Sequence, residues 1–357
     1  MVRLQELGWS PFFQQHWNDK TGRRMPARII EEQRSMYRVA SENAELLAEL
    51  SGQLRYAALD RADLPAIGDW VGIEARLTEG RATIHEVLPR RSCFSRKSAG
   101  EQTTEQIVAA NIDTVFVVTS LNADLNVRRI ERYLATCWDS GARPVVLLSK
   151  ADVCEDIGAA IEAVSEVAVG VPIHALSAMT GEGLDPINGY LKTGETVALL
   201  GSSGVGKSTL INRLLGSNIQ SVLEIREDDS RGRHATTARR LFVLPQGGML
   251  IDTPGMRELQ LWDADSGLSQ AFEDIETLAA NCRFRDCGHQ SEPGCAVQEA
   301  LSENRLMADR FESYLKLRRE MDYMARKQDV LARIETTKQW KRLHKAARER
   351  YRHKGKQ

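Results

Sequence analysis

The stretch Gly201–Thr209, which reads Gly-Ser-Ser-Gly-Val-Gly-Lys-Ser-Thr, decides the fold of this chain. It follows an apolar run, residues 196–200, and precedes a segment with helical spacing of apolar residues, 209–215. Strand, glycine-rich loop and helix in this order are typical of a phosphate-binding loop. Its glycines let successive backbone N–H groups point at phosphate oxygens, and the helix N-terminus adds partial positive charge.

This loop predicts a nucleotide-phosphate site. Lys207 is expected to reach the β- and γ-phosphates, and Ser208 is expected to ligate Mg²⁺. The residues predicted to contact the nucleotide here are Gly201, Ser202, Ser203, Gly204, Val205, Gly206, Lys207, Ser208 and Thr209.

Composition bounds the class of protein. The chain has 357 residues, which suggests about two to three domains. No apolar run approaches the roughly 18 residues of a membrane helix, and the N-terminus lacks a signal-peptide core. We therefore expect a cytoplasmic protein without membrane association.

The charge is distributed unevenly along the chain. The net charge is −1, yet residues 338–357 hold nine Lys or Arg against the single acid Glu349. Trp340 and Tyr351 alternate with these cations, a pattern that favours contact with nucleic acid. The alternative is a solvated helix.

Two kinds of structure are expected before the phosphate-binding loop. Short strand-like runs separated by turns occupy residues 27–31, 36–40, 70–74 and 82–88, a pattern typical of a small β-barrel such as an OB-fold. This barrel could bind nucleic acid or act as a scaffold. From residue 114 onward, apolar strands alternate with helical segments, which predicts a parallel sheet covered on both faces.

Two elements before the phosphate-binding loop are suited to recognise guanine. Ser149-Lys150-Ala151-Asp152 ends a predicted strand and resembles the Asn-Lys-x-Asp element of GTPases. Asp152 would accept hydrogen bonds from guanine N1–H and N2, and the stem of Lys150 would pack on the base. Ser177-Ala178, after another strand, resembles the base-supporting Ser-Ala-x element.

Two further elements follow the loop. Asp252-Thr-Pro-Gly255 ends an apolar strand, so Asp252 is expected near Mg²⁺ and the Gly255 N–H near the γ-phosphate. Thr237 is the expected switch ligand of Mg²⁺, with Thr236 as the alternative. Because base-reading elements precede the phosphate-binding loop, whereas ordinary GTPases have them after it, the order of motifs is circularly permuted.

Motif order and spacing together resemble the ribosome small-subunit-dependent GTPase A family of bacteria. The resemblance extends from about residue 27 onward and includes the connector residues 95–111 and the switch Gly232-Arg-His234. It implies an OB-fold, a permuted GTPase domain and a C-terminal zinc domain. It also implies docking on the small (30S) ribosomal subunit and its 16S rRNA late in maturation.

Three positions bear on catalysis and affinity. Ser149 stands where the family usually has Asn, and the lost side-chain hydrogen bond is expected to weaken guanine binding about tenfold. Met256 occupies the position of a water-orienting glutamine, so the chain should hydrolyse GTP slowly alone. His234 is the candidate to orient the water instead, and the alternative is that it only packs in the switch.

A second metal site is predicted near the C-terminus. Cys282, Cys287, His289 and Cys295 place three thiolates and an imidazole within a short stretch, a ligand set that suits tetrahedral structural Zn²⁺. Cys93, Cys137 and Cys154 lack such partners and are expected to be ordinary thiols.

These observations predict four regions. They are an irregular N-terminal extension (1–26), an OB-fold domain (27–95), a circularly permuted GTPase domain (96–275) and a zinc-binding domain with a basic C-terminal helix (276–357). The expected protein is a monomeric GTPase stimulated by the small subunit, with GTP or GDP, Mg²⁺ and one zinc. The alternative is an RNA-binding assembly factor that uses GTP mainly as a tether.

Overall fold

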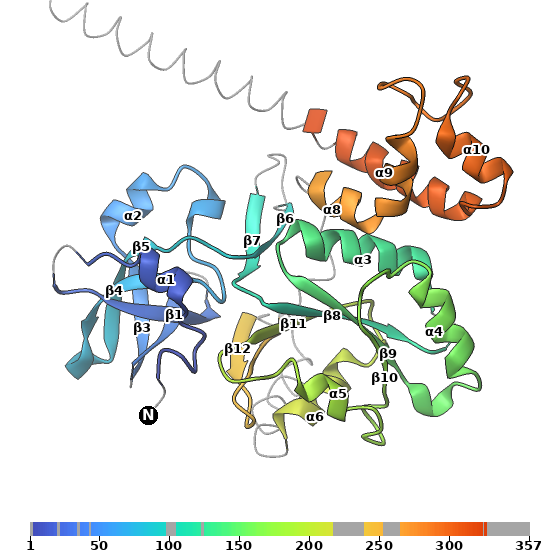
Figure 1. The fold of residues 1–357 in the computed structure, drawn as a ribbon. Helices are drawn as coiled ribbons and strands as arrows, with labels where there is room; N and C mark the ends of the chain where they lie inside the picture. Colours follow the sequence, from blue (N-terminus) through green and yellow to red (C-terminus); the bar gives the residue numbers. More distant parts are fainter. Residues whose placement is uncertain are drawn as a thin grey trace, which may run out of the picture.

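The computed structural model describes residues 3–19, 22–33, 36–42, 44–97, 105–122, 125–216, 239–252, 265–323 and 325–326 of the chain. A β-barrel, a sheet with helices on both faces and a small helical module follow one another along the sequence (Figure 1). The sheet lies between the other two parts and carries the predicted nucleotide site.

The barrel consists of five strands that close on themselves. Their order is β1-β2-β3-β5-β4, and β4 pairs back on β1, which is the strand order of an OB-fold and confirms the predicted barrel. A helix and two 3-10 turns lie on the connections. The elements are β1 (Met25–Glu32), β2 (Tyr37–Ser41), β3 (Ala44–Leu50), α2 (Gly52–Ala57), η1 (Arg61–Asp63), β4 (Trp70–Arg76), η2 (Leu77–Glu79) and β5 (Arg81–Val87).

Within the described residues, the central sheet has five parallel strands and one antiparallel strand. Its order, β10-β9-β8-β11-β13-β12, has only β12 antiparallel to its neighbour β13. The strands are β8 (Thr114–Ser120), β9 (Arg143–Ser149), β10 (Ile173–Ala175), β11 (Thr196–Leu200), β12 (Arg239–Val243) and β13 (Met249–Asp252). The predicted parallel sheet is thus confirmed.

Both faces of this sheet are buried by helices, which explains why its strands are apolar throughout. Val115 and Val117 of β8 pack with α3 (Val127–Asp139) and α4 (Ile157–Ser165) on one face. The alternate residues Phe116 and Val118 pack with α5 (Asp185–Asn188) and α6 (Lys207–Leu215) on the other. Successive side chains of a strand point to opposite faces, so each face receives every second residue.

The barrel and the central sheet are joined edge to edge. Strand β1 pairs with β12 through Glu31↔Arg240 and Glu32↔Arg239, so one ladder of eleven strands runs through both parts. The expected connector before residue 113 contains a hairpin that the sequence did not predict. Its strands are β6 (Cys93–Lys97) and β7 (Glu105–Ala110).

The N-terminal extension packs on the seam between the barrel and the sheet. It contains α1 (Pro11–His16), and its Leu7 and Phe13 are buried. Gly8 has φ +87° and lies so close to Arg28 and Gly194 that a Cβ would come within 2.8 Å of each. The extension is therefore part of the folded core, although its sequence shows no regular period.

A helical module covers the outer side of α3 (Figure 1). Phe311 and Tyr314 are buried in its core, and Leu315 packs against it. The module consists of α8 (Asp265–Ala271), α9 (Glu273–Ala279), α10 (Ala296–Ser302) and a helical segment at residues 308–323. In the described part of the chain no helix is long and apolar enough to cross a membrane.

Candidate functional site

The predicted nucleotide site lies at the carboxyl edge of the central sheet. Strand β11 lies between β8 and β13 in the sheet. From β8 the chain adds β9 and β10 toward one edge, whereas from β11 it adds β13 and β12 toward the other edge. The topological switch point therefore lies between β8 and β11. In open parallel sheets ligands bind outside the carboxyl ends of the strands at such a switch point. The loop after β11 is the phosphate-binding loop, and α6 begins at Lys207.

The phosphate-binding loop adopts left-handed backbone conformations at two of its glycines. Gly204 and Gly206 have φ of 81° and 94°, and Gly206 is the residue that precedes α6. Lys207 folds back over the loop, and its Nζ donates to the carbonyls of Gly201, at 2.6 Å, and Ser202. An ammonium held in this position can move to a phosphate without any change in the backbone.

Ser149 connects the base-reading side of the site to the phosphate-binding loop. Its buried hydroxyl donates to the Val205 carbonyl at 2.5 Å and also lies within hydrogen-bond distance, 3.1 Å, of the Thr119 carbonyl. The side chain that replaces the usual Asn therefore still makes a hydrogen bond to the loop. Strand β9 and the phosphate-binding loop are fixed relative to each other by this contact.

The two predicted base-reading loops lie next to each other. Lys150 has a left-handed backbone with φ 60°, which starts the 3-10 turn η3 (Ala151–Val153) and leaves Asp152 exposed. The Ala151 N–H donates to the Leu176 carbonyl at 3.1 Å, so this turn abuts the loop that contains Ser177 and Ala178. Ser177 is fully buried, and its hydroxyl accepts from the Thr180 N–H.

The two described residues predicted near Mg²⁺ lie just beyond or at the ends of two neighbouring strands, β11 and β13. Asp252 ends β13, which pairs in parallel with β11 through Ala198↔Ile251. Ser208 is the second residue of α6, directly after the loop that follows β11. The predicted residues His234, Thr236, Thr237 and Gly255 lie outside the described residues, as do Met256 and the basic segment 338–357.

Sequence reasoning missed one side chain at the loop. Arg129, in the first turn of α3, donates to the Ser202 hydroxyl at 2.6 Å. Because α3 follows β8, its N-terminal turn lies at the same edge of the sheet as the phosphate-binding loop. No motif marks this arginine, since it becomes part of the site only through the neighbouring positions of β8 and β11.

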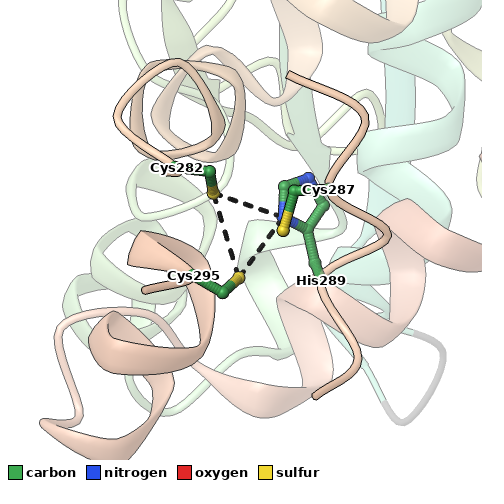
Figure 2. Close-up of side chains that lie close together, drawn as sticks. All are labelled: Cys282, Cys287, His289 and Cys295. Atoms are coloured by element: carbon green, nitrogen blue, oxygen red, sulfur yellow. Dashed lines mark hydrogen bonds between the residues drawn. The ribbon is translucent and has the colours of Figure 1, made fainter. Parts of the chain in front are cut away.

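The predicted metal cluster is assembled in the helical module (Figure 2). The ligand atoms of Cys282, Cys287, His289 and Cys295 lie within 4.8 Å of one another. His289 Nδ1 is 3.6 Å from Cys282 Sγ and 3.5 Å from Cys295 Sγ, and the two sulfurs are 3.9 Å apart. Tetrahedral zinc with Zn–S of about 2.3 Å and Zn–N of about 2.0–2.1 Å requires separations of roughly 3.8 and 3.6 Å.

The surroundings of the cluster favour the metal-binding forms of Cys282 and His289, whereas burial raises the pKa of the Cys287 thiol to about 11. Burial opposes ionisation of Cys282, but the backbone N–H groups of Val297 and Ala296 outweigh it and lower the pKa of this thiol. Burial, followed by the nearby Arg318, lowers the pKa of His289, which favours the neutral imidazole that binds metal. Three thiol groups and a neutral imidazole in this geometry could hold zinc and leave no open position for catalysis.

Fold and site together define a P-loop GTPase with a circularly permuted sheet. If the strands are read in the order β11, β12, β13 and then β8, β9, β10, the phosphate-binding loop comes first and the base-reading elements follow it, as in ordinary GTPases. The chain belongs to the RsgA GTPase family, whose sequence profile matches residues 87–262. A profile of the ABC transporter family also matches residues 184–343, a range that includes the phosphate-binding loop.

Curated relatives are similar over nearly the whole chain. The small ribosomal subunit biogenesis GTPase RsgA 2 of Lactiplantibacillus plantarum is 48% identical, covering 91% of this chain and 92% of that protein. The small ribosomal subunit biogenesis GTPase RsgA of Opitutus terrae is 45% identical over 99% of both chains.

Solved structures share the fold. YjeQ from Thermotoga maritima superposes with a TM-score of 0.64 and 27% identity, covering 82% of this chain and 97% of that chain. YloQ, described as a circularly permuted GTPase, superposes with a TM-score of 0.59 and 21% identity, covering 88% and 98%. At this identity the second structure speaks for the fold alone.

Proposed function

We propose that this protein is a GTPase stimulated by the small ribosomal subunit, which acts in late maturation of that subunit and leaves it after hydrolysis. The observation that carries the proposal is the hydrogen bond from Ser149 to Val205, which joins the base-reading turn and the phosphate-binding loop into one nucleotide site. The relatives named as small ribosomal subunit biogenesis GTPases supply the partner.

Each described residue has a proposed role in binding GTP and Mg²⁺. Asp152 accepts hydrogen bonds from guanine, and Lys207 leaves the loop carbonyls for the β- and γ-phosphates. Ser208 ligates Mg²⁺ directly, and Asp252 holds it through water. The Ser149 hydroxyl retains a bond to the loop, so we propose that guanine affinity is weakened less than the tenfold that the loss of this bond would cause.

The chemical step transfers the γ-phosphoryl group to water. The phosphorus–oxygen bond to the β-phosphate breaks as water attacks, giving GDP and phosphate. We propose that His234 orients this water and that Thr237 binds Mg²⁺ when the γ-phosphate is present.

The chain is proposed to consist of four regions, with one structural zinc in the last. They are residues 1–26, 27–95, 96–275 and 276–357.

The setting of this activity follows from the same proposal. The chain would be a cytoplasmic monomer that contacts 16S rRNA of the small (30S) subunit. GTP would favour the docked state and GDP the released one.

The test measures GTP turnover by the full chain with and without purified small subunits, with ATP as the control nucleotide. Strong stimulation of GTP turnover by the subunits, without stimulation of ATP turnover, supports the proposal. Tight subunit binding without turnover favours a tether instead, and stimulation of ATP turnover contradicts guanine recognition.

A base-swapping variant sharpens this test. Asp152→Asn replaces an acceptor pair with an amide, so binding of GTP should weaken about tenfold or more, whereas xanthosine triphosphate, with a carbonyl at position 2, should bind better. Glu162→Gln, an exposed change on α4, is the matched control and should leave both affinities unchanged. Equal loss for both nucleotides would remove Asp152 from the base site.

A further inference from the structure

The first turn of α3 presents an arginine to the phosphate-binding loop. Arg129 Nη1 donates to the Ser202 hydroxyl at 2.6 Å, across 73 positions of the sequence. Asn126, the N-cap of α3, accepts from the Arg129 N–H at 3.0 Å. This cap fixes the main chain from which the arginine extends, so the side chain points at the loop because of where α3 begins.

Ser202 is bound by two cations at different atoms. Arg129 donates to its hydroxyl, whereas Lys207 Nζ donates to its carbonyl and, at 2.6 Å, to that of Gly201. In the proposed function Lys207 leaves these carbonyls for the β- and γ-phosphates. The bond from Arg129 uses the side chain of Ser202 instead, and a guanidinium keeps its charge, so this contact can persist while GTP is bound.

The residue before Ser202 lies directly against the sheet. A Cβ on Gly201 would come within 2.2 Å of the Val118 carbonyl oxygen, so the main chain of the loop touches β8 at this point. Arg129 belongs to α3, the helix that follows β8 and packs on it (Figure 1). Two consecutive residues at the start of the loop are therefore fixed by one strand and its following helix.

The order of strands shows which end of a bound nucleotide this part of the loop faces. Strand β11 leads into Gly201 and Ser202, and its neighbour β13 ends at Asp252, the proposed partner of Mg²⁺. Mg²⁺ bridges the β- and γ-phosphates. The base-reading turn instead follows β9, which β8 separates from β11. The start of the loop therefore lies toward the γ-phosphate.

We propose that Arg129 is a positioning residue that sets the preference of the site for GTP over GDP. It acts through Ser202, whose bond to the guanidinium keeps the start of the loop in the shape that receives the γ-phosphate. Once Lys207 has moved to the phosphates, this bond replaces the contact that Ser202 has lost. The inference rests on the proposed function, because it concerns the same GTP site.

The experiment compares two affinities of the full chain with Mg²⁺ present, measured by competition with a fluorescent GDP. One is for guanylyl imidodiphosphate, a triphosphate analogue that is not hydrolysed, and the other is for GDP. Arg129→Ala should weaken binding of the analogue about tenfold, because a hydrogen bond from a charged donor is lost. Binding of GDP should change by less than about twofold, because the γ-phosphate is absent from it.

A second variant removes the same bond from its other side. Ser202→Ala should lower the ratio of the two affinities by the same factor, which assigns the effect to this bond rather than to another contact of Arg129. The double variant should lose no more than either single variant, because the two residues act as one unit. Arg129→Lys keeps a charged donor and should give an intermediate ratio.

The matched control is Arg132→Ala, one turn further along α3. This arginine forms a partly exposed ion pair with Glu320 at 2.8 Å, and its loss should leave both affinities unchanged. Thermal unfolding is measured for every variant, because a loss of folded protein lowers both affinities together and leaves their ratio constant.

Four results would overturn the proposal. They are an unchanged ratio in Arg129→Ala and Ser202→Ala, additive losses in the double variant, an equal fall in Arg132→Ala, and a lysine variant no better than the alanine variant.

GTP turnover with and without small subunits, measured in parallel, separates this proposal from the proposed function. If subunits stimulate the unchanged chain but the ratio ignores Arg129 and Ser202, only the positioning role fails. If the ratio depends on both residues but subunits neither bind nor stimulate, the positioning role stands and the ribosomal role fails. If neither guanine nucleotide binds, both proposals fail.

Discussion

Two buried arginines fix the flanking parts of the molecule to the central sheet, and they do so with different partners. Arg28, 1% exposed, holds the barrel and the N-terminal extension, and donates to the carbonyls of Leu7, Gly68 and Asn111 at 2.5, 3.2 and 3.0 Å. Arg310, 4% exposed, holds the helical module by ion pairs to Glu131 of α3, at 2.8 Å, and Asp274.

The environment of each arginine reflects this difference. Burial, only partly offset by Asp113, lowers the pKa of Arg28 to about 10. Burial also opposes the charge of Arg310, but Asp274 and then Glu131 outweigh it and raise the pKa of this group. The ion pairs of Arg310 can be replaced by apolar side chains, because both partners of each pair are side chains. The acceptors of Arg28 are main-chain carbonyls, which no substitution removes.

The largest effect is expected from removal of the metal. Structural zinc supplies on the order of 10–16 kcal/mol of binding free energy, so a chelator should unfold the helical module and leave the barrel and central sheet folded. Hydrogen exchange of α9 and α10 measures this, and Cys154→Ser, outside the cluster, is the control for cysteine loss. Retained protection of the module after zinc removal would contradict the prediction.

The second effect tests the carboxylate joint. Arg310→Met leaves Glu131 buried with an unbonded oxygen and, among the described residues, only Arg128 as a partner, and should cost about 3–5 kcal/mol in urea unfolding. Adding Glu131→Leu should recover most of this loss, because no buried charge remains. Arg305→Ala breaks an exposed ion pair and should change stability by less than about 0.5 kcal/mol. Failure of the double variant to recover would show that packing, not charge, dominates.

The third effect tests the carbonyl joint. Arg28→Met leaves the carbonyls of Leu7 and Asn111 without this donor, at about 1–3 kcal/mol for each buried acceptor. We expect a total loss of about 2–4 kcal/mol in urea unfolding, with loss of exchange protection in residues 3–19. Arg143→Met, which removes an exposed ion pair, is the control. A loss below about 1 kcal/mol would mean that water replaces the arginine.

The smallest effect concerns the strand joint between β1 and β12. Arg239→Ala removes the ion pair to Glu32 but leaves the main-chain ladder, so the free energy of unfolding should fall by only about 1 kcal/mol. Arg240→Ala, whose contact with Glu31 is 3.9 Å long and more exposed, should have less effect. If Arg239→Ala cost as much as Arg28→Met, the side-chain pair rather than the ladder would hold the joint.

Some strands could not be predicted because local preference and final structure disagree. Strand β3, Ala-Glu-Leu-Leu-Ala-Glu-Leu, consists of residues that favour helices, yet it pairs with β2 and β5 to close the barrel. The hairpin β6–β7 lies in a basic, serine-containing connector with little β-strand signal. Tertiary pairing overrides local preference in both cases.

The sequence by itself determined the class of nucleotide-binding protein, the permuted order of motifs and the candidate metal ligands. These depend on residue types at fixed short spacings, such as Gly204, Gly206 and Lys207 in one loop or Cys282 to Cys295 in one module. Only the tertiary structure decided that Arg129 contacts the phosphate-binding loop, that Ser149 bonds to Val205 and that Arg28 joins four segments. Those contacts unite residues that lie 21 to 83 positions apart in the sequence, and their partners are main-chain or hydroxyl groups that leave no mark in a sequence.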